Sequence, residues 1–373
     1  MINFDFAATT PMSEKAISAY AQAAEFAYGN SSSLHDIGEK ADEVLSLCRK
    51  TFASLIGGSE KGVYFTSGGT EGNILTIKSL LNATPGKKHI IASSIEHASI
   101  HHFLLFLQSK GFDVSFIEHE QTGKISIETL EKAIRNDTAL VTIQHGNSEI
   151  GTIQNIREIA AFLRRKNIRF HTDCVQTFGK LAIDVGKMNA DAYTFSSHKI
   201  YGPKGTGAVY ICPQSEWAPA IPGATHESGF RPGTVDVPGI FSFVTAAKEF
   251  YNDRKKHISH FSHLRQHLIS NLKKWTPSIT IVNEQETEVL PNIVGLVTNS
   301  YEGQYVMLEL NRRGFAVSTG SACQAGMQQP SRTLLAIGFN QERAHQFIRI
   351  SFGIRTTLTE IDELVKAIAA IVR

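Results

Sequence analysis

Cysteine is scarce in this chain: four residues in 373, widely separated and with no CxxC pair. This spacing excludes a disulfide framework and a zinc knuckle, so each thiol must be judged alone. The sequence also lacks any run of about 18 apolar residues, which excludes a transmembrane span. Its start has neither the basic region nor the apolar run of a secretory leader. We therefore expect a soluble, cytoplasmic protein with no membrane partner.

An excess of one charge is also missing. Lysine and arginine together number 37 against 35 for aspartate and glutamate, a net charge of +2. Such a balance offers no basic stripe for the phosphates of a nucleic acid, so we expect no nucleic-acid partner. The chain is longer than a single core usually grows, and it contains no repeat. It is therefore predicted to form one large and one smaller domain.

Short β-rich runs alternate with helical segments between about residues 62 and 212. The predicted strands are 63–66, 89–92, 114–117, 139–143, 168–171, 190–195 and 208–211. Segments between them, such as 126–135 and 156–166, carry apolar residues at helical spacing. This βαβ rhythm predicts a mostly parallel sheet covered by helices on both sides.

The pattern changes after the Gly/Pro-rich passage 219–238. A long helical stretch is predicted over 240–275, then a β-rich, turn-broken region to about residue 351. A closing helix is expected over 359–372, with Thr359 as its N-cap. We predict a large α/β domain over 12–245, and a smaller α+β domain formed by 1–11 and 246–373.

Lys199 stands between the run Tyr-Thr-Phe-Ser-Ser-His (193–198) and the run Ile-Tyr-Gly-Pro-Lys-Gly (200–205). A lysine just past a buried strand, beside hydroxyl and imidazole donors and glycines, suits an amine that forms a Schiff base next to a phosphate. The alternative is a solvated lysine at a strand end, with Lys204 as the nearest competitor for the role.

Asp173 lies in the run Phe-His-Thr-Asp-Cys-Val-Gln (170–176), at the end of another predicted strand. The carboxyl ends of parallel strands face the crevice where such sheets bind ligands. A carboxylate there can keep a pyridine nitrogen protonated, and Gln176 can donate to a phenolic oxygen of the same ring. The alternative is that Asp173 caps the next helix.

The run Phe-Thr-Ser-Gly-Gly-Thr-Glu-Gly-Asn (65–73) is a strand, a glycine turn and a helix start. Backbone N–H groups and the helix dipole make such a junction an anion site, to which Thr70 adds a hydroxyl. No GK[ST] follows, so it is not a P-loop. The alternative is an ordinary capped helix start.

Cys323 lies among small residues, in Ser-Thr-Gly-Ser-Ala-Cys-Gln-Ala-Gly (318–326), which indicates an exposed and movable thiol. Cys48 and Cys212 have apolar neighbours and are expected to be inert core residues. The alternative for Cys323 is a small buried filler. With a pKa of about 8.5, only a few per cent of a free thiol is thiolate at pH 7, so a neighbouring proton acceptor is required.

Two further residues are candidates for the same site. His97 follows a strand end, where it can stack on the ring and shuttle protons, or act as a structural histidine. Arg349, between apolar neighbours, can grip a substrate carboxylate, or form an interdomain salt bridge. Four histidines share a helical face without a carboxylate ligand, so no metal site is predicted from them. They are His257, His260, His263 and His267.

Taken together and in this order, these motifs resemble the cysteine desulfurases of the NifS/IscS type, within the class V, fold-type I group of pyridoxal 5'-phosphate enzymes. The resemblance runs from the segment FDFAATTP (4–11) to Arg349 and the final helix. SSHKIYGPKG and STGSAC are its most specific parts. It implies a fold-type I α/β architecture, pyridoxal 5'-phosphate as cofactor, and L-cysteine as substrate. The expected product is alanine, with a persulfide on Cys323 whose sulfur passes to an acceptor protein for iron-sulfur cluster or thio-cofactor synthesis.

The resemblance also assigns roles. Lys199 is implied as the Schiff-base lysine, Asp173 as the pyridinium partner and Arg349 as the residue that binds the substrate carboxylate. Gln176 is implied at the phenolic oxygen and His97 over the ring. The phosphate is expected to be held by Gly69, Thr70, Ser196 and His198. Thr234 is similar to a threonine that reaches the phosphate of a neighbouring subunit, which implies a homodimer.

Two departures from the family pattern stand out. The usual Asn-Asn-Glu-Ile-Gly is replaced by Asn-Ser-Glu-Ile-Gly (147–151), so Ser148 occupies the position of a cofactor-contacting asparagine. Arg355 lies one position later than the family's Gly-Arg pattern and receives no role. Rival interpretations are another class V enzyme, namely a selenocysteine lyase or a small-molecule aminotransferase, or a non-catalytic assembly scaffold.

Overall fold

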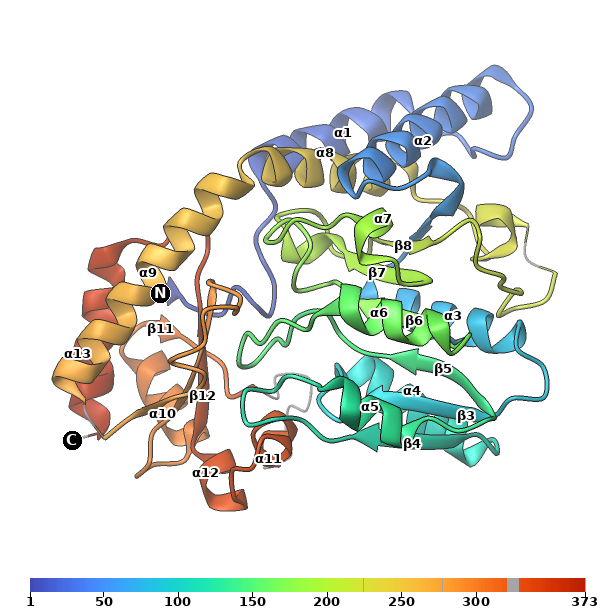
Figure 1. Cartoon of the computed structure of the whole chain (residues 1–373). Helices are drawn as coiled ribbons and strands as arrows, with labels where there is room; N and C mark the ends of the chain where they lie inside the picture. The colour runs from blue at the N-terminus through green and yellow to red at the C-terminus, as the bar shows by residue number, and fades with distance from the viewer. Residues whose placement is uncertain (224, 277, 321–328, 373) are drawn as a thin grey trace.

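A seven-stranded sheet forms the centre of the fold in the computed structural model, which describes residues 1–223, 225–276, 278–320 and 329–372 (Figure 1). The strand order is β2-β8-β7-β6-β5-β3-β4. Strand β8 is antiparallel to both of its neighbours, and the other pairs are parallel. The strands are β2 (Val63–Thr66), β3 (His89–Ser93), β4 (Asp113–Ile117), β5 (Thr138–Thr142), β6 (Arg169–Asp173), β7 (Ala192–Ser196) and β8 (Gly207–Ile211).

The predicted mostly parallel sheet is confirmed, and each predicted strand agrees with the observed one to within two residues at either end. Successive side chains of a strand point to opposite faces, so each strand supplies two cores. In β3, Ile91 joins one buried cluster while Ile90 and Ala92 join another. Because both faces are covered, every residue of β3, β5 and β7 is buried, and their burial does not alternate along the strand.

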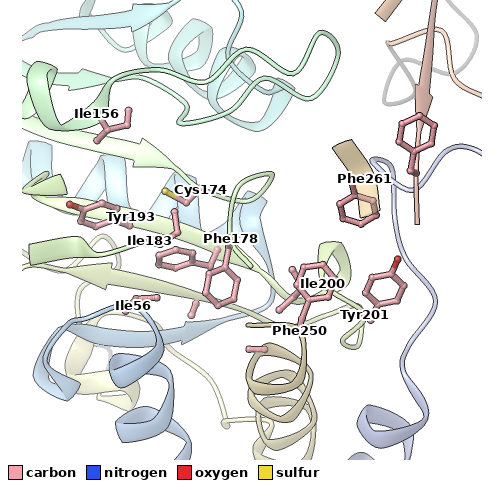
Figure 2. Close-up of a cluster of buried hydrophobic side chains, with 14 of the residues drawn as sticks. Ile56, Ile156, Cys174, Phe178, Ile183, Tyr193, Ile200, Tyr201, Phe250 and Phe261 are labelled. Atoms are coloured by element: carbon pink, nitrogen blue, oxygen red, sulfur yellow. The ribbon is translucent and has the colours of Figure 1, made fainter. Parts of the chain in front are cut away.

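Helices cover both faces of the sheet. The first face packs against α2 (Asp36–Leu55), α6 (Ile156–Arg165) and α8 (Val237–Asn252), and the second against α3 (Gly69–Asn82) and α4 (Ala98–Ser109). Figure 2 shows part of the first core, which runs from Tyr193 and Cys174 on the sheet past Phe178 to Phe250 and Phe261. The other helices of this part are α1 (Glu14–Phe26), α5 (Ile127–Ala133) and α7 (Val185–Met188), with short 3-10 turns η1 (Glu60–Gly62), η2 (Ser197–Lys199) and η3 (His226–Gly229).

A second group of elements lies beside the sheet, at the left of Figure 1. Its strands form an antiparallel sheet of order β12-β10-β9 and a parallel pair, β1-β11. The strands are β1 (Ile2–Asn3), β9 (Thr280–Ile281), β10 (Ile293–Val297), β11 (Phe315–Ala316) and β12 (Phe347–Ser351). The helices are α9 (Arg254–Trp275), α10 (Gly303–Arg312), α11 (Arg332–Ala336), α12 (Gln341–His345) and α13 (Leu358–Val372). The predicted boundary between residues 245 and 246 falls inside α8, and the division into domains stays a prediction.

The predicted helical stretch over 240–275 is confirmed, and it consists of two helices, α8 and α9, which meet at Asp253. The predicted N-cap of the closing helix was wrong. The N-cap of α13 is Thr357, not Thr359, because Thr357 Oγ1 accepts from the Glu360 amide at 3.2 Å and Glu360 Oε2 accepts from the Thr357 amide at 2.7 Å. This reciprocal pair is a capping box.

Residues 4–13 run from the smaller part to the edge of the large sheet. The amide of Ala7 donates to Ser351 Oγ at 2.9 Å, and the amide of Ser351 donates to the carbonyl of Phe4 at 2.7 Å. Further on, the amide of Thr10 donates to the carbonyl of His198 at 2.9 Å. The segment is therefore tied at one end to β12 and at the other to the turn that follows β7.

None of the helices in the described part of the chain combines the length and the apolar character that crossing a membrane requires.

Replacing Ser351 by alanine should lower the free energy of unfolding by about 1–3 kcal/mol, because the buried amide of Ala7 loses its acceptor. Urea denaturation measures this change. The matched control is Ser18→Ala on the exposed side of α1, for which we expect a change within about 0.5 kcal/mol. Equal stabilities of the two variants would contradict the role given to the Ser351 hydroxyl.

Candidate active site

A cavity of about 430 Å³ lies at the carboxyl ends of β5, β6 and β7, where Arg349 of β12 also reaches it. Most of the predicted site residues line it together. They are Gly69, Thr70, His97, Ser148, Asp173, Gln176, Ser196, His198, Lys199 and Arg349. A second cavity of about 410 Å³ shares several of these residues and adds Lys204 and Gly205. Parallel strand ends thus gather residues that are far apart in the sequence.

The carboxylate of Asp173 is held from two sides at the end of β6. Its Oδ2 accepts from Asn73 Nδ2 at 2.9 Å and its Oδ1 accepts from the Val175 amide at 2.8 Å. Both bonds fix the direction of the carboxylate. Asp173 accepts from no amide of a helix's first turn, so it is not the helix cap of the alternative interpretation. Sequence reasoning gave Asn73 no role, although it stands in the quoted run 65–73.

The amine of Lys199 lies in the turn η2, directly after β7. Its Nζ donates to the carbonyls of Ala7 at 2.6 Å and Ala8 at 2.7 Å. The amine therefore points inward to the cavity rather than into solvent. Lys204, its competitor in the sequence, lines only the second cavity and is exposed.

The start of α3 forms one wall of both cavities. Its N-cap is Gly68, with φ at 144°, and no side chain caps the helix. The first-turn N–H groups of a helix without a side-chain cap are available to an anion, and Thr70 and Ser196 place hydroxyls nearby. His198 Nδ1 lies 3.1 Å from Thr9 Oγ1. Burial, aided by nearby lysine charges, lowers the pKa of His198 to about 4, so its imidazole is neutral.

His97 caps α4, because its Nδ1 accepts from the Ser99 amide at 3.2 Å. Its imidazole remains accessible from the cavity. Burial lowers the pKa of His97, the charge of Asp173 opposes this, and the charge of Lys199 reinforces it. A neutral imidazole is the form that can accept a proton at neutral pH.

Arg349 is 3% exposed, and its guanidinium is fixed by two partners. Nη2 donates to Asp5 Oδ1 at 2.5 Å and Nη1 donates to the carbonyl of Ser148 at 2.9 Å. A salt bridge was the alternative interpretation of Arg349, and the ion pair with Asp5 is such a contact. Its Nε, however, has no hydrogen-bond partner among the described residues. Ser148 contributes its backbone carbonyl to this arrangement.

Two predicted residues are not brought into the cavity by the described structure. Thr234 is exposed and lines neither cavity. Cys323 lies outside the described residues, although Gly320, just before it in the chain, lines the larger cavity. Of the other thiols, burial raises the pKa of Cys48 to about 12, which fits an inert core residue. The same expectation was wrong for Cys212, which is half-buried at the end of β8.

The histidine-rich face of α9 takes part in packing and pairing. His257 lies against the ring of Phe250, with centroids 4.6 Å apart, and His267 Nε2 lies 2.6 Å from Asp362 Oδ1. Across the described ranges, no group of histidine, cysteine and carboxylate side chains is arranged to hold a metal ion.

Comparison with known proteins gives concordant matches. Residues 2–364 match the family model of the class-V aminotransferases. "Putative cysteine desulfurase NifS" of Bacillus subtilis (strain 168) is 48% identical over 366 residues, covering 98% of this chain and 93% of that protein. "Cysteine desulfurase IscS" of Methanosarcina thermophila is 37% identical, covering 100% and 92%. A solved structure named "NIFS-LIKE PROTEIN" has a TM-score of 0.92 at 30% identity, covering 99% of this chain and 98% of that chain.

The chain belongs to the aminotransferase class-V family. Its match to NifS and IscS proteins confirms the family resemblance and the fold-type I architecture expected from the sequence. Pyridoxal 5'-phosphate is the cofactor of this class-V protein.

The cavity of this class-V protein fits that cofactor. It offers a carboxylate, an amine and an uncapped helix start with hydroxyls, which are the groups that a pyridine nitrogen, an aldehyde and a phosphate require. Two buried atoms of lining residues, Asn73 Oδ1 and Gln176 Oε1, have no hydrogen-bond partner in the described part of the chain. Gln176 Nε2 donates to the carbonyl of Ala7 at 3.0 Å, so the atom of this side-chain amide that lacks a partner is Oε1.

One buried acid beside this cavity escaped sequence reasoning. Glu96 is 2% exposed, and its Oε1 accepts from the Gln144 amide at 2.7 Å. Burial, reinforced by the charge of Asp173, raises the pKa of Glu96 well above its usual range, which favours the protonated carboxyl in the folded protein. In the sequence, only its position next to His97 could have indicated that Glu96 lies near the site.

Replacing Glu96 by glutamine should make stability less sensitive to pH. Unfolding frees the Glu96 carboxyl to lose its proton once the pH exceeds about 4.3, so the wild type loses stability as the pH rises, by up to about 1.4 kcal/mol per pH unit. Glutamine does not titrate. In urea denaturation between pH 5 and 8, the free energy of unfolding of Glu96→Gln should rise relative to that of the wild type as the pH increases. The exposed control Glu118→Gln should show the same pH dependence as the wild type. If Glu96→Gln and the wild type showed the same pH dependence of the free energy of unfolding, Glu96 would be ionised in the folded protein.

Proposed function

We propose that this chain is a cysteine desulfurase, which converts L-cysteine to L-alanine and leaves the sulfur as a persulfide on Cys323. The observation that carries the proposal is the meeting of Lys199, Asp173 and Arg349 in one cavity. It is supported by a relative 48% identical over 98% of the chain that is named a putative cysteine desulfurase.

Arg349 binds the substrate carboxylate in this proposal. Its guanidinium is planar and suited to a carboxylate, and Asp5 and the carbonyl of Ser148 hold it in place before substrate arrives. A preoriented guanidinium loses little freedom on binding, which favours affinity. The Asp5 carboxylate also offsets the cost of burying the cation.

Lys199 would hold the cofactor, which would supply an electron sink for the substrate's α-carbon. Asp173 keeps the proton on the ring nitrogen, and Asn73 with the Val175 amide keeps the Asp173 carboxylate directed there. Lys199 Nζ would move the α-proton of the substrate. His97, neutral and facing the cavity, accepts and returns protons during these transfers.

Cys323 supplies the nucleophile. Its thiolate attacks the substrate sulfur, a sulfur–sulfur bond forms as the carbon–sulfur bond breaks, and the released electron pair stays with the carbon skeleton. Protonation of that skeleton yields alanine. The persulfide then passes its outer sulfur to an acceptor protein for iron-sulfur cluster or thio-cofactor synthesis. This thiol chemistry requires a reducing compartment, and we propose the cytoplasm.

A homodimer is part of the proposal, and the surface of α1 and α2 supports it. Several large apolar side chains are exposed on these helices and their connection: Ile17, Tyr20, Phe26, Tyr28, Leu34 and Ile37. Large apolar side chains exposed on neighbouring segments suit an interaction site. Ser31 of this connection and Val235 line one cavity, so the connection lies near the exposed Thr234. A partner copy seated there would meet Thr234, as the predicted phosphate contact across subunits requires.

The desulfurase proposal predicts alanine and thiol-dependent sulfide in equal amounts when the purified yellow protein is incubated anaerobically with L-cysteine. Cys323→Ala should stop sulfide release, by about a hundredfold or more, and keep the yellow colour, because the thiol is the nucleophile and not a cofactor ligand. Cys212→Ala, at a half-buried cysteine outside the cavity, is the matched control. Full turnover by Cys323→Ala would reject the role of this thiol, and amino-group transfer to a 2-oxo acid without sulfide would favour an aminotransferase.

The homodimer proposal predicts a mass of about 82 kDa by sedimentation, twice the 41.0 kDa of the chain. Leu34→Glu should shift the mass toward the monomer, because it places a charge in the apolar surface. Leu308→Glu, at an exposed leucine of α10, should leave it unchanged. Thr234→Ala should remain dimeric but lose cofactor more readily on dialysis. A monomeric wild type, or unchanged cofactor retention in Thr234→Ala, would contradict the corresponding part of the proposal.

A further inference from the structure

Glu71 is an acid in a cavity that is expected to hold a phosphate. It lines the second cavity together with three of the predicted phosphate-binding residues, Thr70, Ser196 and His198. Its side chain is 30% exposed, so solvent screens its charge only in part. A carboxylate beside a bound phosphate repels it, because both groups are anions. The charge of Glu71 therefore opposes the binding of a phosphate in this cavity.

The start of α3 gives a structural reason for Glu71. It is the third residue of the helix, whose N-cap is Gly68, and its Oε2 accepts from the Ser67 amide at 2.6 Å. An acid in the first turn stabilises a helix through the helix dipole. Ser67 precedes the helix, so this bond leaves the first-turn N–H groups to an anion. The helix start thus benefits from the same charge that disfavours a phosphate.

Arg231 supplies a counter-charge to Glu71. Its Nε donates to Glu71 Oε2 at 3.1 Å and to Oε1 at 3.2 Å, and its side chain is 22% exposed. In the described part of the chain, Glu71 forms no other ion pair. Removal of the Arg231 guanidinium would leave the Glu71 carboxylate without a cation beside the cavity.

The alternative role of Arg231 is to tie its own segment, between β8 and α8, to α3. That segment already has a stronger anchor in Glu227, whose side chain is 1% exposed and which accepts from Arg49 Nη1 at 2.9 Å and Nη2 at 2.8 Å. Glu227 Oε2 also accepts from the Phe65 amide of β2 at 2.7 Å. Partly exposed ion pairs add little to stability. The fold therefore depends on Arg231 less than on Glu227.

We propose that Arg231 neutralises the Glu71 carboxylate and thereby allows the start of α3 to hold the phosphate of the cofactor. Arg231 is a positioning residue that acts through Glu71. It sets the preference of the site for pyridoxal 5'-phosphate over pyridoxal, which lacks the phosphate. The inference rests on the cofactor site of the proposed function and adds to it a residue that lines neither cavity.

The first experiment titrates the full chain, freed of cofactor, with pyridoxal 5'-phosphate and with pyridoxal, and follows the yellow absorbance. The dissociation constant for pyridoxal divided by that for pyridoxal 5'-phosphate is the phosphate preference. Arg231→Met should lower this preference about tenfold, because the unpaired Glu71 carboxylate repels the phosphate. The matched control is Arg169→Met, which removes an arginine of similar exposure, 23%, that lines neither cavity. Equal preferences in the two variants would overturn the inference.

The second experiment separates neutralisation from a tether. Glu71→Gln removes the charge but keeps an oxygen that can accept from the Ser67 amide, so it should raise the phosphate preference by about threefold. The double variant Glu71→Gln with Arg231→Met should return to within about threefold of the wild type. A double variant as low as Arg231→Met would show that Arg231 acts only as a tether. If Arg231→Met does not fold, Glu71→Gln decides alone, because a preference at or below that of the wild type contradicts the inference.

Salt provides a third measurement. At about 1 M sodium chloride the screening length falls to about 3 Å, so the effect of an unpaired Glu71 should weaken. The tenfold deficit expected for Arg231→Met relative to the wild type in the same salt should shrink to about threefold or less. A deficit that salt leaves unchanged is the result expected of a lost tether, and it would reject the electrostatic role.

Anaerobic incubation of the holoenzyme with L-cysteine separates this inference from the proposed function. If the phosphate preference responds to Arg231 and Glu71 as expected but no alanine forms, the desulfurase proposal fails and the inference stands. If alanine and sulfide form while the preference does not respond to Arg231, the inference alone is rejected.

Discussion

The hydrogen bonds from Lys199 Nζ to the carbonyls of Ala7 and Ala8 are the contact on which the site depends. The segment 4–13 that carries these carbonyls is fixed at β12 and again at His198, and Gln176 Nε2 also donates to the Ala7 carbonyl. The segment thereby joins the two groups of elements at the cavity. Asp5 of the same segment also orients Arg349. The predicted cofactor lysine and the predicted substrate arginine are therefore both held by residues of the segment 4–13.

Burial sets the charge state of the groups around the cavity. It favours the acid form of Glu96 and the neutral imidazoles of His97 and His198. In this low-dielectric setting, the remaining charges act strongly on bound groups. Asp173, with its two N–H donors, and the Arg349–Asp5 pair lie at separate positions around the cavity, which suits a ligand with a cationic ring nitrogen and an anionic carboxylate.

The sequence predicted what depends on local pattern and on the geometry of parallel sheets. Strand limits followed from apolar runs and turn residues, and Asp173 and Lys199 were found because functional side chains gather at strand ends. The missed residues owe their roles to partners far along the chain: Asn73 meets Asp173 across 100 residues. The cap of α13 was misplaced although Thr357 and Glu360 carry the capping-box spacing, and neither glycine nor proline marks the end of α8 near Asp253.

The bond between Ala7 and Ser351 joins residues 344 positions apart in the chain. A contact of this span closes a very long loop, and contacts between residues so distant in the sequence are slow to form in folding. During synthesis, Lys199 leaves the ribosome long before Ser351, the residue that fixes the segment on which its amine rests. The large sheet can therefore assemble first, while the site gains its final geometry only when the last strand, β12, is in place.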